Sequence, residues 1–385
     1  MIRLEMTCAV RRFWLTAGLL VGGASLDPGP SDAYRFYPIW DAGEVAEFIP
    51  VADSATQWDE SVWPSGEQLG WVVANDPGWT ATWTDRNGNV QGPPLENARD
   101  IIPFLTAALR TWSDIDGADI LWEVSGIAAG LHTAEQGDGR PTFYVDATAT
   151  LGALARYWDH RTTNGDWVRV DCDVPLAPFA VAEIVDHRWW SAVLVHELGH
   201  CLGLAHAGAF PRVPGDLPRS WPGFSGVFGP DPTMSYGDYV IGTGDITRDD
   251  RIGAALLRPT PAWKAATSSI MGSVTVAGDP APFVQVFAIR VSGSTGAVGA
   301  FTNRAGSFRI EGLAPGQYLI WAGPVQFHGA YYAHAVLFQP GFGAPPAVLD
   351  VSDQALLQPV RVAMGSPTEV HIALRRTRRS ANRTE

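Results

Sequence analysis

The chain has 385 residues, of which 46% are hydrophobic and 17% are charged, and its net charge is −13 at neutral pH. This balance is that of a globular protein and not of a disordered one, and the length is enough for two or three domains with packed cores. The acidic excess argues against sequence-independent binding of nucleic acid, which requires clustered positive charge.

The N-terminus has the pattern of a targeting segment. An apolar run covers residues 13–26 and follows Arg11 and Arg12. The run matches a signal-peptide core in length and is short for a membrane span, so we predict a signal peptide over residues 1–33. The alternative is a buried N-terminal helix. We expect no membrane span in the mature chain and a secreted, extracellular or periplasmic location, with residues 34–67 forming an N-terminal extension or a short pro-segment.

Cysteine usage leaves one pairing question open. Removal of the signal peptide would remove Cys8 and leave Cys172 and Cys201. In an exported protein these two residues can form one disulfide, or they can be two separate buried thiols. Sequence alone does not decide between the two, because a bridge needs a particular distance.

The first two thirds of the chain read as a mixture of strands and helices. A one-sided apolar stripe predicts a helix that begins at Ile101, with Asp100 as its N-cap. Near residue 258 a second helix is predicted to end, with Thr247 as N-cap and Asp250 completing a capping box. The remaining predicted elements are strands at 69–74, 79–84, 120–124, 142–145 and 168–174, and a helix at 189–202.

The last third has a different character. From residue 270 onward, short alternating segments are separated by Gly and Pro, which is typical of a β-sandwich. We place this sandwich at 268–374, and we expect the Arg-rich tail 375–385 to be disordered. The predicted fold class is therefore α+β, a mixed twisted sheet with helices, followed by an all-β sandwich.

The segment 195–206, VHELGHCLGLAH, carries the chemistry. His196 and His200 are four residues apart, so on a helix they share one face and can bind one metal ion. Glu197 lies beside that face and can reach a metal-bound water. Gly203 can adopt the positive φ that ends a helix, which lets His206 return as a third ligand. Three imidazoles leave one tetrahedral position open, as in a catalytic zinc site.

The length of the pattern decides how specific it is. HExxH alone is short and only suggestive, whereas the full segment fixes five positions. The alternative is a solvated helix with three ordinary histidines. Leu194, Val195, Leu198 and Leu202 favour the metal site, because they give the helix a side suited to a protein core.

HELGHCLGLAH resembles the extended zinc motif of the metzincin metalloproteases. The family has a methionine turn beneath the metal, and Met234 in the segment DPTMSY fits that position. The turn is similar to that of astacins and serralysins, which implies that Tyr236 is a displaceable fifth ligand or a donor to the oxyanion. Met234 as an ordinary core residue and Tyr236 as a packed aromatic are the alternatives.

Two further segments resemble the matrixin branch of the metzincins: ARDIIPFLTAALRTWSDIDGADILWEV and ITRDDRIGAALLRP. We therefore expect a matrixin-like catalytic domain over 68–262. The cysteine switch of matrixin pro-segments is absent. The resemblance also suggests a structural Ca²⁺ at Asp166, Asp171 and Asp173, for which ordinary solvated aspartates are the alternative.

The C-terminal part, in particular TNRAGSFRIEGLAPGQY at 302–318, resembles carboxypeptidase regulatory-like or transthyretin-like β-sandwich modules. Such modules are attached to secreted enzymes, and the likeness implies no catalysis. We expect this domain to contact protein or glycan.

Together the resemblances imply a secreted zinc-dependent endopeptidase, monomeric, with one catalytic Zn²⁺, Glu197 as general base and a protein or peptide as substrate. Two other classes stay open. One is a non-catalytic extracellular zinc-containing protein that binds or adheres through the β-sandwich. The other is a zinc hydrolase acting on a substrate that is not a peptide.

Overall fold

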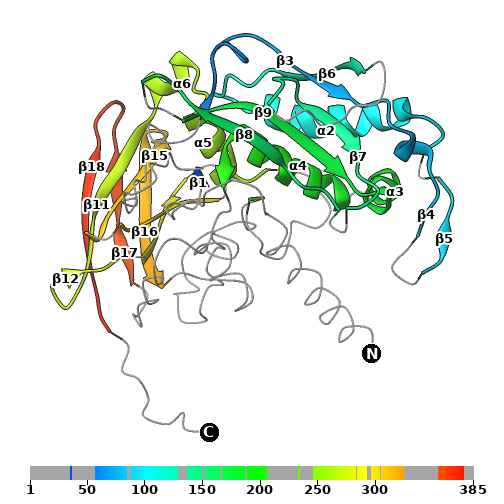
Figure 1. Cartoon of the computed structure of the whole chain (residues 1–385). Helices are drawn as coiled ribbons and strands as arrows, with labels where there is room; N and C mark the ends of the chain where they lie inside the picture. Colours follow the sequence, from blue (N-terminus) through cyan, green and yellow to red (C-terminus); the bar gives the residue numbers. More distant parts are fainter. Residues whose placement is uncertain are drawn as a thin grey trace, which may run out of the picture.

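The computed structural model divides the chain into a mixed helix–sheet region and a following region of β sheets (Figure 1). It describes residues 35–36, 57–84, 88–93, 95–128, 137–149, 152–164, 167–186, 189–205, 233–234, 246–282, 284–292, 296–303, 305–324 and 354–376. The predicted signal peptide lies outside these residues, as do most of the predicted N-terminal extension and of the Arg-rich tail.

The first region is built on a six-stranded sheet in the order β2-β9-β7-β3-β6, with β8 beside β9. All neighbouring pairs are parallel except β8 with β9. The strands are β2 Gln57–Trp58, β3 Leu69–Val73, β6 Trp122–Ile127, β7 Thr142–Val145, β8 Arg156–Arg161 and β9 Trp167–Leu176.

Three α-helices accompany this sheet: α2 Ile102–Ser113, α3 Pro178–Asp186 and α4 Trp189–Leu202. The smaller elements are two 3₁₀ helices, η2 Pro77–Thr80 and η3 Ala98–Ile101, and the hairpin of β4 Trp83–Thr84 and β5 Val90–Gln91. Directly after α4, the strand β10 Leu204–Ala205 pairs antiparallel with β1 Arg35–Phe36.

Tryptophan is the main large side chain of this core. The chain has 16 tryptophans, and several of them are buried here. Trp71 stacks on Phe143 with ring centroids 4.7 Å apart. Such offset aromatic pairs add stability beyond the area they bury. Six of the 16 tryptophans belong to the buried cluster of this region: Trp58, Trp63, Trp71, Trp79, Trp112 and Trp122.

Two local predictions in this region are wrong. Residues 79–84 were predicted as one strand, but η2 occupies their first part because the Asp76 carboxylate accepts a bond from Gly78 N at 2.7 Å and caps a 3₁₀ turn. Asp100 is not the N-cap of the next helix. Asn97 caps η3, and Asp100 completes that capping box by accepting from the Asn97 backbone N–H at 3.0 Å.

Other predictions are confirmed. Helix α4 has the predicted bounds, and β7 coincides with the predicted strand at 142–145. Helix α5 spans Arg248–Leu257, is capped by Thr247, and carries the predicted capping box with Asp250. The short helix α6, Pro261–Ala266, follows and leads into the β region.

The C-terminal region has two four-stranded sheets. One has the order β12-β11-β15, with β18 parallel to β11, and the other is the antiparallel sheet β14-β13-β16-β17. One cluster of buried apolar residues contains members of both sheets. The strands are β11 Ser268–Val276, β12 Asp279–Pro280, β13 Val284–Arg290, β14 Ala297–Phe301, β15 Ser307–Leu313, β16 Gly316–Pro324, β17 Gln354–Val362 and β18 Thr368–Leu374.

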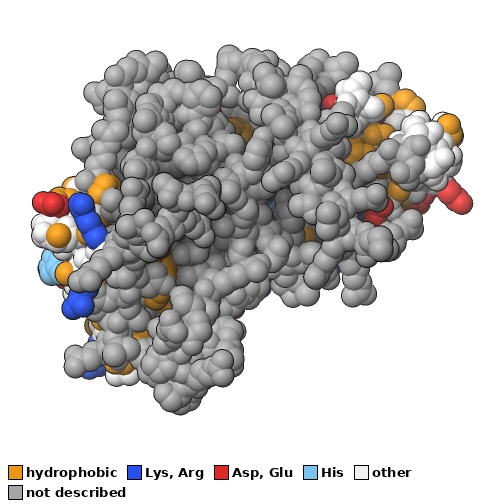
Figure 2. Space-filling view, turned by 90° about the horizontal axis from the view of Figure 1, so that it is seen from below, with side chains coloured by type: hydrophobic (Ala, Val, Ile, Leu, Met, Phe, Trp, Pro, Cys, Tyr) orange, Lys and Arg blue, Asp and Glu red, His pale blue; other side chains and the backbone are white. Residues whose placement is uncertain are grey.

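The coarse fold expectation is therefore confirmed: a mixed α/β region with a largely parallel sheet precedes sheets that are mainly antiparallel. Among the described residues, no helix is both long and apolar enough to cross a membrane. In the view from below, Lys and Arg side chains are seen at the end that carries the C-terminal sheets, and acidic side chains are seen at both ends (Figure 2).

Candidate metal centre

Helix α4 carries the HExxH segment through the interior of the first region. Its apolar side chains Leu194, Val195, Leu198 and Leu202 are all buried in the core. The helix ends at Leu202, and Gly203 follows with φ at 123°, a conformation that L side chains rarely adopt. The predicted role of Gly203 in ending the helix is thus confirmed.

His196 and His200 lie together on one side of α4, with ring centroids 4.7 Å apart. Each ring donates its Nδ1 proton to a backbone carbonyl, His196 to Thr233 O at 2.6 Å and His200 to Leu204 O at 2.7 Å. With Nδ1 protonated, the lone pair of a neutral imidazole is on Nε2, the form and the nitrogen that ligate a metal ion. Carbonyl partners of this kind orient metal-binding histidines.

Burial keeps both imidazoles neutral. The two side chains are buried, and this lowers the pKa of His196 to about 4 and that of His200 well below its ordinary value. Because metal ligation requires the unprotonated ring nitrogen, these two residues are in the state that a zinc site needs at neutral pH.

Glu197 is also buried, and it faces the chain that leads into β8. Its Oε2 accepts the backbone N–H of Ala155 at 2.7 Å. Burial raises the pKa of Glu197 to about 8, and the bond from Ala155 opposes that rise. The carboxyl group is therefore held at a fixed place, one residue before the edge strand begins.

Met234 packs against α4 at Gly199, a residue that lies between His196 and His200 in the sequence. A Cβ atom added at Gly199 would be 2.3 Å from Met234 Sδ and 2.9 Å from Trp112 Cζ2. Glycine is required here for close approach, because any side chain would overlap with the sulfur atom. Asp250 holds the methionine segment by accepting from Thr233 N at 2.8 Å and from Met234 N at 3.2 Å.

The C-terminal end of α4 is fixed by a buried arginine. Arg169 of β9 donates from Nη1 to the carbonyl oxygens of His200 and Cys201. Its other nitrogens form an ion pair with Asp159, the Nε to Oδ1 distance being 2.9 Å, and its guanidinium lies over the Tyr157 ring. A cation at the end of a helix satisfies carbonyl groups that have no partner within the helix.

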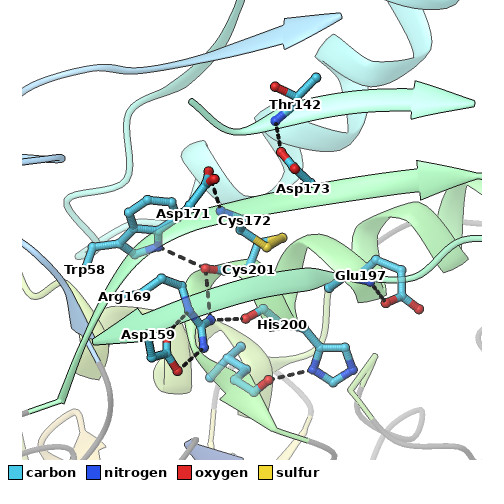
Figure 3. The surroundings of a disulfide bond; sticks show 12 residues. Trp58, Thr142, Asp159, Arg169, Asp171, Cys172, Asp173, Glu197, His200 and Cys201 are labelled. Atoms are coloured by element: carbon cyan, nitrogen blue, oxygen red, sulfur yellow. Dashed lines mark hydrogen bonds and ion pairs between the residues drawn. A yellow bond between two sulfur atoms is a disulfide. The ribbon is translucent and has the colours of Figure 1, made fainter. Parts of the chain in front are cut away.

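Two further contacts join the same helix end to the sheet. Cys172 of β9 and Cys201 form a disulfide, so of the two alternatives for these cysteines the structure has the bridge. The indole Nε1 of Trp58 donates to Cys201 O at 2.9 Å. Figure 3 shows Trp58, Arg169 and the disulfide meeting around Cys201.

Sequence reasoning did not identify Arg169 or Trp58 as neighbours of the site. Their contacts span 31 and 143 residues. In the predicted strand 168–174, Arg169, Asp171 and Asp173 alternate with apolar residues and would be assigned to the solvent face. All three are buried. An arginine and two aspartates alternating in one strand was the only local signal.

The burial of Asp171 and Asp173 contradicts the alternative that they are ordinary solvated aspartates. Asp171 accepts backbone N–H groups from Gly137, Asp138 and Cys172, and Asp173 accepts that of Thr142 at 3.0 Å. Burial and neighbouring carboxylates raise the pKa of Asp171 to about 6 and that of Asp173 to about 8. Asp166, the third residue of the expected calcium site, lies outside the described residues.

His206 and Tyr236 also lie outside the described residues, so the structure brings together His196, Glu197, His200 and Met234 of the predicted set. Within the described ranges, no three His, Cys, Asp or Glu side chains are grouped so that they could hold a metal ion. The donor set present, two neutral oriented imidazoles beside a carboxylate, fits the chemistry of a zinc site that has one further ligand.

No protein-family model and no curated protein matches the sequence. Solved structures match at low similarity. The GM1-bound form of the ECX AB5 holotoxin has 12% identity and a TM-score of 0.23, over 43% of this chain and 63% of that chain. Fervidolysin from Fervidobacterium pennivorans, a keratinolytic enzyme related to subtilisin, has 12% identity and a TM-score of 0.23, over 82% of this chain and 61% of that chain. In both cases the match spans less than two thirds of the known chain, and such low values support no argument about fold or function.

Proposed function

We propose that the protein is an exported zinc-dependent endopeptidase of the metzincin type, with a catalytic domain over 68–262 and a β-sandwich over 268–374. The observation that carries the proposal is the turn of α4 at residues 196–200. There, two neutral imidazoles with carbonyl-oriented Nδ1 atoms lie beside a buried carboxylate. The Cys172–Cys201 disulfide supports export, because such bonds persist in oxidising compartments.

His196 and His200, together with His206, would hold the metal. When bound, zinc supplies Lewis acidity, which polarises a carbonyl oxygen and lowers the pKa of water to about 7. The charge of the bound zinc would favour the ionised form of Glu197, whose carboxylate would then act as the general base: it would take the proton of the attacking water and pass it to the leaving amine as the C–N bond breaks. The hydrogen bond from Ala155 N–H occupies Oε2 of Glu197. The other oxygen, Oε1, would therefore take the proton.

A substrate in extended conformation would add to the sheet beside β8. Among the described strands, β8 pairs only with β9, so its other side is an edge. Main-chain pairing at such an edge gives recognition that depends little on side chains. Because Ala155 immediately precedes β8 and contacts Glu197, a peptide lying along this edge would pass the catalytic carboxylate.

The test uses Glu197→Gln in the full exported chain. We expect zinc to stay bound, measured by native mass spectrometry, while kcat/KM for casein falls by at least about 100-fold. His206→Ala should instead release zinc. Full activity of Glu197→Gln would refute the assignment.

A wild type that binds zinc but digests neither casein nor gelatin, with or without chelator, would favour the adhesion alternative. Cleavage of esters but not of peptides would favour a different zinc hydrolase.

A further inference from the structure

Helix α5 belongs to both hydrophobic cores of the molecule. Ala254 and Leu257 pack in the core of the first region, whereas Ile252 and Leu256 pack with the C-terminal sheets. The strand β15 approaches so closely that a Cβ added at Gly312 would be 2.7 Å from Ile252 Cγ2. A shift of β14 or β15, the strands that contact α5 directly, would therefore be transmitted to the helix.

Two adjacent carboxylates at the start of α5 point to different regions. The Oδ1 of Asp249 accepts the backbone N–H of Gly299 in β14 at 2.9 Å. Asp250 instead accepts the backbone N–H groups of Thr233 and Met234. Both side chains are buried, so these bonds are shielded from water and their geometry is tightly determined.

The path continues to the candidate zinc ligand. The carbonyl oxygen of Thr233 accepts the Nδ1 proton of His196 at 2.6 Å. A sheet of the C-terminal region is thus connected to His196 through Gly299, Asp249, Asp250 and Thr233, with one peptide unit of α5 between the two carboxylates. A shift of β14 against α5 would change the place of Thr233 O and with it the orientation of the imidazole.

We propose that Asp249 is a positioning residue through which the C-terminal sheets set the geometry of His196. The inference rests on the proposed function only in taking His196 as a metal ligand. It gives the β region a part in the metal site, in place of the independent role of an attached module. The contact between the two regions is formed by the N-terminal turn of α5 on one side and by the backbone of β14 at Gly299 on the other.

The test compares three variants of the full chain. Asp249→Ala removes the acceptor for Gly299 N–H. Asp249→Asn keeps an oxygen at the same place and serves as the conservative rescue. Ile320→Ala opens a cavity in the core of the C-terminal sheets and does not touch the path. Zinc affinity is measured by competition with a chromophoric chelator, and the geometry of the metal site by the visible spectrum of the cobalt-substituted protein.

We expect Asp249→Ala to weaken zinc binding about 10-fold, the size found when the outer partners of metal ligands are lost, and to change the cobalt spectrum. Asp249→Asn should stay within about twofold of the wild type. Ile320→Ala should lower thermal stability and leave affinity and spectrum unchanged. If Asp249→Ala does not fold, Ile252→Ala replaces it, because this change weakens the packing of α5 against β15. Ile252→Ala should also lower the affinity for zinc.

Wild-type zinc affinity and an unchanged cobalt spectrum in Asp249→Ala would overturn the inference, as would equal losses in Ile320→Ala. A wild-type chain that binds zinc but cleaves no peptide would refute the proposed activity and leave this coupling measurable. A wild-type chain that binds no zinc would refute both.

Discussion

Helix α4 and the C-terminal sheets are held by different kinds of contact. Arg169, Trp58 and Trp112, all distant in sequence, donate hydrogen bonds to carbonyl oxygens of α4, and a disulfide ties its end to β9. The two C-terminal sheets instead meet through a cluster of apolar side chains. Hydrogen bonds depend on direction as well as distance, whereas apolar packing is not directional. Helix α4 is therefore fixed by several long-range directional bonds in addition to its apolar packing.

The largest expected effect comes from Arg169→Met. The change removes one of the donors to each of the carbonyls of His200 and Cys201 and leaves Asp159 without its arginine partner, which should cost about 4 kcal/mol of unfolding free energy. Urea unfolding measures it. By contrast, Ile320→Val in the C-terminal core should cost about 1 kcal/mol. Similar losses for the two variants would remove the distinction between the regions.

Arg169→Lys sharpens this test. Lysine keeps the charge but lacks the planar fork that reaches Asp159 and the helix end together, so we expect a loss between those of the wild type and Arg169→Met. Wild-type stability in the lysine variant would mean that charge alone accounts for the contact.

The disulfide should contribute slightly less. Replacing both Cys172 and Cys201 with Ala frees a loop with a sequence separation of 29 in the unfolded chain, for an expected loss of about 3 to 4 kcal/mol. Thermal unfolding with and without reductant checks it. Reductant should lower the midpoint of the wild type and leave the double variant unchanged. If reductant lowered the midpoint of both proteins equally, the effect would not come from the Cys172–Cys201 disulfide.

Gly199→Ala should cost about 2 kcal/mol, although alanine is ordinarily the better helix former, because the new methyl group overlaps Met234 Sδ. The matched variant is Gly199→Ala with Met234→Ala. The two losses should be clearly less than additive, since the smaller side chain gives room for the methyl group. Additive losses would show that the two residues do not meet.

A pH dependence is expected from β9. The pKa of Asp173 is raised to about 8 in the folded chain, mainly by burial, so between about pH 4 and pH 8 the folded state holds a proton that the unfolded state has lost. This contribution is fully present below pH 4 and is lost as the pH rises to 8. Asp173→Asn should flatten the decline in urea unfolding measured at pH 5 and pH 8.

The exposed Asp279→Asn serves as the control and should leave that pH dependence as it is. Added Ca²⁺ at pH 8 should restore stability to the wild type if Asp171 and Asp173 bind the ion. An Asp173→Asn variant with the same decline as the wild type would contradict the assignment to this carboxyl group.

Local signals predicted the elements whose causes are local. The HExxH spacing with its apolar flanks located α4, and Thr247 with Asp250 located the start of α5. The prediction of a strand at 79–84 was wrong because Asp76 caps a 3₁₀ turn there, and the turn excludes an extended conformation for the first residues of that segment. Arg169 was not recognised, since its partners lie beyond the reach of any local pattern. The alternation of polar and apolar residues in β9 gives no sign of this burial, because both faces of the strand are covered.

The contact between Gly199 and Met234 also constrains how related chains can diverge. The space beneath α4 holds one sulfur atom and no additional methyl group. A relative in which position 199 carries a side chain therefore needs a smaller residue at position 234 and a small displacement of Trp112, so a change at position 199 should be accompanied by a change at position 234. Natural sequences that have a side chain at position 199 would then be expected to differ at position 234 as well.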